Sequence, residues 1–129
     1  MILVDTSAWI DFFRGNQPLA DRVDELLASN EVALCGPVLT GLRRGLRSAS
    51  EGRKVVPLLG GCHQLNQPEL LWEEAGDLGF ALARKGVTVK TLDLLIATFA
   101  LSHGIALLEN DIDFDAMQRA GIPLMLMSQ

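Results

Sequence analysis

The chain has 129 residues, of which 49% are hydrophobic and 21% are charged, and its formal net charge is −5. This composition indicates one globular domain over residues 1–129 and excludes a disordered chain. The acidity argues against a protein that coats nucleic acid through charge alone. No apolar stretch approaches the roughly 20 residues that span a bilayer, and residues 1–4 do not form a signal peptide. We therefore expect a cytoplasmic protein with no membrane association.

Strands and helices are predicted to alternate along the chain, from apolar spacing and from terminal caps and glycines. The predicted strands are Ile2–Val4, Val32–Leu34, His63–Asn66, Ile105–Leu108 and Pro123–Met127. The predicted helices are Ser7–Arg14 (capped by Thr6 or Ser7), Pro18–Ser29, Pro37–Arg47, Glu51–Leu59, Leu70–Lys85, Thr91–His103 and Ile112–Ala120. This order favours an α/β fold with a parallel sheet and helices on both faces, in which ligands bind beyond the carboxyl ends of the strands.

Acidic residues follow the predicted strands at their carboxyl ends. Asp5 comes directly after the first strand, and Asp111 and Asp113 lie in the loop after the fourth. Asp93 lies in the first turn of its helix. Close carboxylates repel one another unless a cation compensates, and no histidine or cysteine accompanies them at the spacing of metal ligands. The pattern therefore suits Mg²⁺ or Mn²⁺ better than zinc.

Each of these acids also has a purely structural interpretation. A lone aspartate after a strand commonly caps a helix or fills a turn, and Asp93 is favoured by the helix dipole alone. Asp111, Asp113 and Asp115 can form a solvated run before the last helix. Spacing alone does not decide between the structural and the metal-binding interpretation.

The acids lie within three motifs: MILVDTSAWI at residues 1–10, TLDLLIA at residues 91–97 and LLENDIDF at residues 107–114. In order and spacing these motifs resemble the PIN-domain ribonucleases, especially the VapC toxins of prokaryotic toxin–antitoxin pairs. The resemblance covers the whole chain and implies a PIN-like three-layer fold with about five parallel strands flanked by helices. It also implies Mg²⁺- or Mn²⁺-dependent cleavage of RNA, often a tRNA or rRNA, a cognate VapB-like antitoxin and a toxin homodimer.

The resemblance also implies roles for individual residues. Asp5, Asp93 and Asp113 match the metal ligands, and Asp111 is a further catalytic acid. The residues that match supporting roles beside the first aspartate or a metal-bound water are Thr6, Ser7 and Asn110.

The chain departs from the family pattern at Gly41. The family carries a glutamate in the helix after the second strand, in a pattern Thr-Glu-Leu-x-x-Gly, whereas residues 40–45 are TGLRRG. Glycine inside a helix costs roughly 1 kcal/mol relative to alanine, so we expect the fold to have no reason of its own for Gly41. We interpret Gly41 as a substitution, natural or introduced, that impairs cleavage, and expect Gly41→Glu to restore cleavage and stabilise the helix. Glu31 and Glu109 are alternative acids that no motif places in the site.

Basic and aromatic residues are secondary candidates. Arg43, Arg44 and Arg47 can contact RNA phosphates, although a solvated helix face is the simpler interpretation. Core packing is expected for both cysteines and for Trp72, whereas surface or helix-end positions are expected for both histidines. The residues that can stack on bases, but for which we expect core or dimer packing, are Trp9, Phe12 and Phe13.

Two functions from different classes are compatible with these observations. One is a metal-dependent endoribonuclease of the toxin type, and the other is a PIN-like binding module that holds RNA or an antitoxin without cleavage because of Gly41. A phosphoacceptor receiver domain is disfavoured, because it needs adjacent acids after the first strand and a lysine after a late strand. RNA cleavage by this chain and by Gly41→Glu separates the first two functions.

Overall fold

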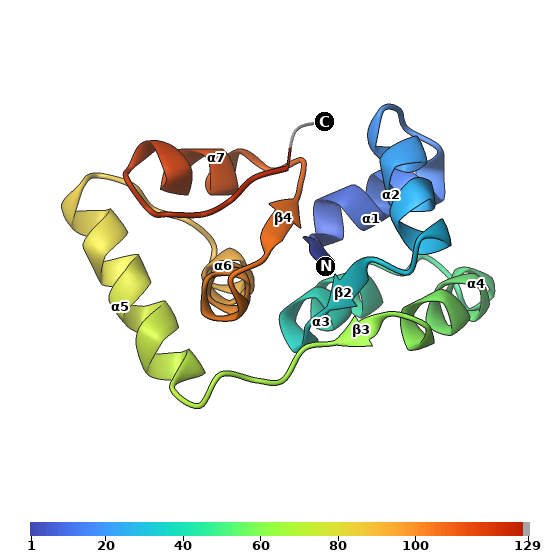
Figure 1. The fold of residues 1–129 in the computed structure, drawn as a ribbon, viewed down its shortest axis with the longest axis horizontal. Helices are drawn as coiled ribbons and strands as arrows, with labels where there is room; N and C mark the ends of the chain where they lie inside the picture. Colours follow the sequence, from blue (N-terminus) through green and yellow to red (C-terminus); the bar gives the residue numbers. More distant parts are fainter. Residues whose placement is uncertain (128–129) are drawn as a thin grey trace.

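The computed structural model describes residues 1–127, in which four short parallel strands form one sheet (Figure 1). The central strand β1 pairs with β2 on one side and with β4 on the other, and the sheet order is β3-β2-β1-β4. The strands β1 and β4, from opposite ends of the chain, therefore lie side by side. The strands are β1 (Ile2–Val4), β2 (Val32–Leu34), β3 (His63–Gln64) and β4 (Ala106–Leu108).

Helices occupy most of the remaining described chain. α1 packs against α2 and α3, α3 packs against α6, and α6 packs against α5 and α7. Figure 1 shows α5 at the outer side of α6, at the opposite end of the molecule from α2 and α4. None of these helices is long and apolar enough to cross a membrane. The helices are α1 (Thr6–Arg14), α2 (Leu19–Ala28), α3 (Gly36–Arg44), α4 (Ala49–Gly60), α5 (Leu71–Arg84), α6 (Thr91–His103) and α7 (Ile112–Arg119).

The predicted α/β fold with a parallel sheet is confirmed, but the expected fifth strand is reduced to one bridge. Only Leu126 of the predicted strand Pro123–Met127 pairs, in parallel, with Leu107. The Leu124 N–H donates back to the Ile122 carbonyl at 2.8 Å, so the segment is bent before it reaches β4. The helix predicted to reach Arg47 ends at Arg44, where the Gly45 N–H donates to carbonyls of its last turn.

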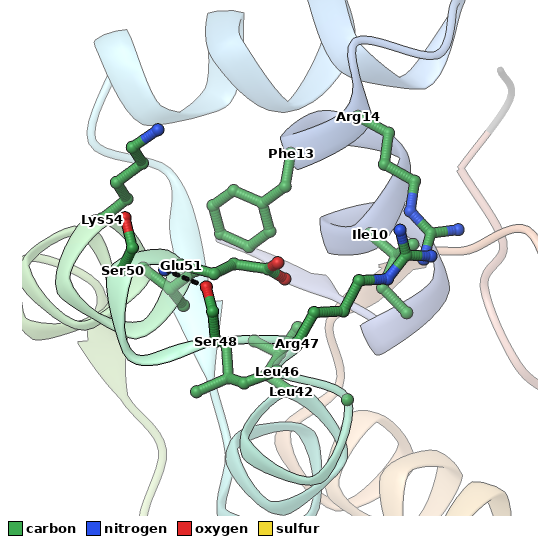
Figure 2. A pocket seen from close by; sticks show the side chains of 12 residues that line it. Ile10, Phe13, Arg14, Leu42, Leu46, Arg47, Ser48, Ser50, Glu51 and Lys54 are labelled. Atoms are coloured by element: carbon green, nitrogen blue, oxygen red, sulfur yellow. Dashed lines mark hydrogen bonds between the residues drawn. The ribbon is translucent and has the colours of Figure 1, made fainter.

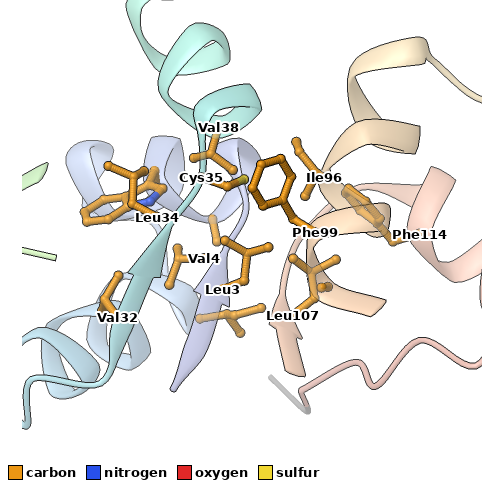
Figure 3. Packing of buried hydrophobic residues seen from close by; sticks show 14 of the residues in the cluster. Leu3, Val4, Val32, Leu34, Cys35, Val38, Ile96, Phe99, Leu107 and Phe114 are labelled. Carbon is orange, nitrogen blue, oxygen red and sulfur yellow. The ribbon is translucent and has the colours of Figure 1, made fainter. Parts of the chain in front are cut away.

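The hydrophobic core lies between the sheet and the surrounding helices (Figure 3). Leu3 and Val4 of β1 are fully buried, beside Leu107 of β4 and Phe99 of α6. The fully buried ring of Trp9 stacks on Phe13 and meets Phe12 edge-on, which agrees with the packing role expected of these aromatics. Both cysteines are buried and free, and both histidines are exposed, as expected.

The prediction that Trp72 is a core residue is wrong, because 62% of its surface is exposed. α5 buries Leu71, Ala75 and Leu82, the face that packs on α6. One helical position rotates a side chain by about 100°, so Trp72 points away from the face that holds Leu71.

Two tryptophans of opposite burial test this core. We expect Trp9→Ala to lower the free energy of unfolding by about 3–5 kcal/mol, because it removes a buried ring and leaves a cavity. Trp72→Ala, the matched control, should change it by about 0.5 kcal/mol or less. Urea denaturation followed by far-UV circular dichroism measures both. Equal losses for the two variants would contradict this description of the core.

Candidate functional site

Asp5 joins the end of β1 to the start of α1. Its backbone N–H donates to the Leu108 carbonyl at 2.9 Å, which continues the pairing with β4 beyond the strand. Its carboxylate caps α1, because Oδ2 accepts the Ser7 N–H at 3.1 Å and the Ser7 hydroxyl at 2.6 Å. The prediction that Thr6 or Ser7 caps this helix is therefore wrong. Asp5, with extended backbone, already provides the oxygen that the free amides of the first turn need.

A chain of hydrogen bonds connects Asp5 to the loop after β4. The Ser7 hydroxyl that donates to Asp5 also accepts the backbone N–H of Asn110 at 2.8 Å. The side-chain amide of Asn110 donates to Asp11 at 2.9 Å. Of the predicted supporting residues, Ser7 thus contacts a site acid directly, whereas Asn110 reaches it through its main chain.

The other three predicted acids lie together at the N-termini of α6 and α7. One carboxylate oxygen from each of Asp93, Asp111 and Asp113 lies within 4.8 Å of the other two. Asp111 caps α7 by accepting the Asp113 N–H at 3.0 Å, and Asp93 is in the first turn of α6. The Lys90 ammonium lies 3.1 Å from Asp111 Oδ2 and 3.6 Å from Asp93 Oδ2. We call these three carboxylates the acid cluster, and the Lys90 ammonium lies against them.

Asp5 faces the acid cluster without belonging to it. Burial raises the pKa of Asp5, and the charge of Asp111 raises it further, against the hydrogen bonds that Ser7 donates. The sequence grouped Asp5 with Asp93 and Asp113 and gave Asp111 an assisting role, whereas the structure groups Asp111 with Asp93 and Asp113. All four acids nevertheless meet at the carboxyl edge of the sheet.

Burial and mutual repulsion shift the pKa values of the clustered acids in different directions. Burial raises the pKa of Asp93 to about 8, with further contributions from the hydrogen bond to Asp113 and the charges of Asp111 and Asp5. Burial also acts to raise the pKa of Asp113, but hydrogen bonds from Asp93 and from Lys90 outweigh it and hold this pKa below its usual range. The two shifts run in opposite directions: the environment favours the neutral form of Asp93 and the charged form of Asp113.

Glu109, which the sequence offered only as an alternative acid, is a fifth acid at this edge. It is buried, and its carboxylate accepts the backbone N–H of Asp111 at 2.7 Å. Burial raises its pKa to about 7, and the charges of Asp115 and Asp5 add to this effect. The available signal was its position, because it follows β4 directly, as Asp5 follows β1.

The donor set at this edge fits a hard divalent cation. Asp5 Oδ1 and Asp93 Oδ2 are buried, and within residues 1–127 neither has a hydrogen-bond partner. Buried polar atoms without a partner are rare, and a bound cation satisfies such carboxylate oxygens. Burial raises the pKa of the nearby Cys35 thiol to about 12, so this residue offers no thiolate that would favour a softer metal.

Comparison with known proteins identifies the family of this chain. The PIN domain family model matches residues 2–120. The chain belongs to the PIN-domain family. "VapC ribonuclease Mb1587" of Mycobacterium bovis is 32% identical over 124 residues, which are 92% of each chain. "Ribonuclease VapC21" of Mycobacterium tuberculosis is 32% identical over 121 residues, which are 88% of this chain and 83% of that protein.

Solved structures share the fold of this PIN domain. DNA-bound VapBC from Salmonella typhimurium matches with a TM-score of 0.76 at 20% identity, over 98% of this chain and 96% of that chain. VapBC2 from Rickettsia felis, bound to a promoter DNA fragment, matches with a TM-score of 0.75 at 22% identity, over 98% of both chains. The resemblance to PIN domains and VapC proteins is therefore confirmed, with four strands instead of about five.

Gly41 lies where α3 meets the start of α1 in this PIN domain. A Cβ at this position would lie 2.6 Å from Thr6 Oγ1, 3.2 Å from Thr6 Cγ2 and 3.4 Å from Leu92 Cδ2. The expectation that the fold has no reason for a glycine here is therefore wrong, because the Thr6 side chain fills the place of a Cβ. The Thr6 hydroxyl is itself buried and, within the described residues, has no hydrogen-bond partner. Gly41 and Thr6 thus form a close-packed pair beside Asp5.

The predicted RNA-binding arginines form no ion pair with the acid cluster within the described residues. Arg43 and Arg44 are exposed in the last turn of α3. Arg47 lies beyond the helix and, with Arg14, lines a cavity of about 330 Å³ among residues of α1, α3 and α4 (Figure 2). Phe13 also lines this cavity, but none of the four predicted acids does. The structure thus brings the acids together and gives the basic residues a separate surface.

The crowding at Gly41 has a measurable consequence. We expect Gly41→Glu to destabilise the domain by about 1–3 kcal/mol, because overpacking outweighs the gain in helix propensity. Thr6→Ala, which removes both crowding atoms, should recover most of this loss in the double variant. Urea denaturation measures each step.

Gly76→Glu on α5 is the matched control, because nothing lies within 4 Å of a Cβ at Gly76. At Gly76 helix propensity acts alone, so Gly76→Glu should raise the free energy of unfolding by up to about 1 kcal/mol. If Gly41→Glu is as stabilising as Gly76→Glu, Thr6 does not crowd this position.

Proposed function

We propose that this PIN domain is an endoribonuclease toxin of the VapC type that uses Mg²⁺ or Mn²⁺ and is neutralised by a VapB-like antitoxin. The observation that carries the proposal is the convergence of Asp93, Asp111 and Asp113 within 4.8 Å, with Asp5 alongside. The names of its relatives, which are VapC ribonucleases at 32% identity, support the substrate class.

In this proposal the acid cluster and Asp5 hold the metal, and the surrounding residues orient them. A bound Mg²⁺ lowers the pKa of a water and stabilises the leaving oxygen of a phosphodiester. Ser7 fixes the rotamer of Asp5 through two hydrogen bonds, and Asn110 holds the Ser7 hydroxyl in place.

Gly41 is the proposed reason for weak cleavage. A glutamate at this position would begin beside Thr6 and next to Asp5, where it can orient a water or supply a further ligand oxygen. Glycine offers neither. Losing one general acid or base commonly lowers a rate by about 10²–10⁴-fold. If the loss of cleavage rate is complete, the chain has the second candidate function, that of a PIN-like module that binds without cleavage.

Cleavage of total cellular RNA tests the proposal. With Mg²⁺ we expect slow cleavage by the chain as it stands, and none with a chelator or with Asp93→Asn, because these remove the metal or a ligand. Asp77→Asn on α5, an exposed aspartate outside the site, should leave the rate unchanged. Gly41→Glu with Thr6→Ala should raise the rate by about 10²–10⁴-fold.

Each alternative gives a different pattern in this experiment. Cleavage that survives the chelator and Asp93→Asn would contradict the metal site. Equal rates with and without the glutamate would show that Gly41 is not the missing catalytic position, and Glu109 would then be the next acid to replace. No cleavage by any variant would favour the binding module.

A basic antitoxin side chain is the proposed inhibitor of the acid cluster. The titles of similar structures name VapBC complexes and a toxin–antitoxin complex from Klebsiella pneumoniae. The contact between Lys90 and three carboxylates supports the idea that an ammonium or guanidinium fits there, with charge-assisted hydrogen bonds. Arg43 and Arg44 stay the proposed RNA contacts, as exposed cations in the last turn of α3, the helix that carries Gly41.

A homodimer is also proposed, and α5 offers an apolar surface for it. Trp72 and Phe80 are 62% and 66% exposed, and they lie eight residues apart, on one face of the helix. Exposed apolar patches of this kind commonly mark protein interfaces. The exposed Gly76 between them leaves room for close approach of a second helix.

The partner proposals can be tested by co-expression. A gene for a short protein should lie directly beside this one, and its product should co-purify with this chain as a complex larger than one toxin and one antitoxin. Size-exclusion chromatography with light scattering measures the mass. A lone monomer under these conditions would contradict both the antitoxin and the dimer, and a complex with one toxin would contradict the dimer alone.

A further inference from the structure

Lys90 occupies the point to which the three clustered carboxylates converge. Its ammonium lies 3.1 Å from Asp111 Oδ2, 3.6 Å from Asp93 Oδ2 and 3.8 Å from Asp113 Oδ2. These three residues also offer the oxygens that lie within 4.8 Å of one another. The ammonium and a metal ion would therefore use the same ligands.

The Lys90 side chain enters the acid cluster from the solvent. It is 65% exposed, whereas the side chains of Asp93 and Asp111 are 7% and 20% exposed. Its backbone is fixed, because its N–H donates to Asp113 Oδ2 at 3.2 Å and the residue directly precedes α6. The flexible four-carbon stem can thus swing outward while the main chain keeps its place.

We propose that Lys90 is a built-in competitor of the divalent cation: its ammonium neutralises the acid cluster and must leave when the metal binds. This inference rests on the metal site of the proposed function. Two cations cannot share one set of ligands a few ångströms apart without strong repulsion. Metal affinity is therefore reduced by the fraction of time that the ammonium occupies the cluster. In this role Lys90 acts on the metal only through the carboxylates that it occupies, and it needs no contact with RNA.

Direct Mn²⁺ binding tests this competition without measuring cleavage. Free Mn²⁺ is followed by its electron paramagnetic resonance signal during titration of the whole chain. We expect Lys90→Gln to bind Mn²⁺ about tenfold more tightly, the factor for an ammonium that occupies the cluster about nine-tenths of the time. Lys90→Arg, which keeps the charge, should stay near the wild-type affinity. Lys54→Gln on α4 removes the same charge from a residue that forms no ion pair within residues 1–127, and it corrects for net charge.

Thermal unfolding gives a second readout that a simple surface ion pair would not change. Without Mn²⁺, Lys90→Gln should melt below the wild type because the acid cluster loses its counterion. With saturating Mn²⁺ this difference should vanish or reverse. A difference that stays the same with and without Mn²⁺, together with an unchanged affinity, would overturn the proposal.

Asp93→Asn separates this inference from the proposed function. If Asp93→Asn abolishes Mn²⁺ binding while Lys90→Gln binds no more tightly than Lys54→Gln, the metal site stands and the competition is wrong. If neither the wild type nor Lys90→Gln binds Mn²⁺, both the metal site and the competition are wrong.

Discussion

Repulsion among carboxylates at one edge of the sheet is the constraint on which this site depends. Asp5 and the acid cluster place four carboxyl groups where burial already disfavours charge. Two local features reduce the repulsion: the amides at the starts of α1 and α7, and the Lys90 ammonium. A divalent cation would replace the ammonium, because it offers more charge to the same oxygens. The local chemistry around these acids is thus the chemistry of a cation site.

The pairing of β1 with β4 explains how residues about a hundred positions apart come to this edge. Val4 lies opposite Leu108 in the parallel ladder, so the residues that follow, Asp5 and Glu109, leave the sheet at the same level. The Asp5 N–H donates to the Leu108 carbonyl, and the Asn110 N–H donates to the Ser7 hydroxyl. These two hydrogen bonds join the segment after β1 to the end of β4 and the loop that follows it. α6 and α7 then begin close enough for their first turns to complete the cluster.

Gly41 illustrates how packing changes the meaning of a missing residue. In the sequence, Gly41 is a weak helix former that stands where the family pattern has a glutamate. In the structure it is also the position that lets Thr6 lie against α3, beside Asp5. The loss of a catalytic oxygen and the gain of a close contact are consequences of the same substitution. Chemistry and packing at this position therefore have to be changed together.

Much of the fold could be predicted because strands, helices and their ends depend on local spacing, and the acids stand directly after strands. The errors arose where a residue's partner is distant. Trp72 has helical neighbours that are buried, yet within residues 1–127 its own side chain stays 62% exposed. The segment at residues 123–127 has the composition of a strand, but it bends at Ile122–Leu124 and meets β4 through a single bridge, between Leu126 and Leu107.

By itself, the amino-acid sequence determined the α/β order of elements, the identity of the four acids and the departure at Gly41, because each is encoded within a few neighbouring residues. Only the tertiary structure decided that Asp111 joins Asp93 and Asp113, that Lys90 lies among them, and that Thr6 fills the space at Gly41. These are distances of a few ångströms between segments far apart in the chain. Spacing along the chain carries no information on such distances until the sheet order and the helix packing set them.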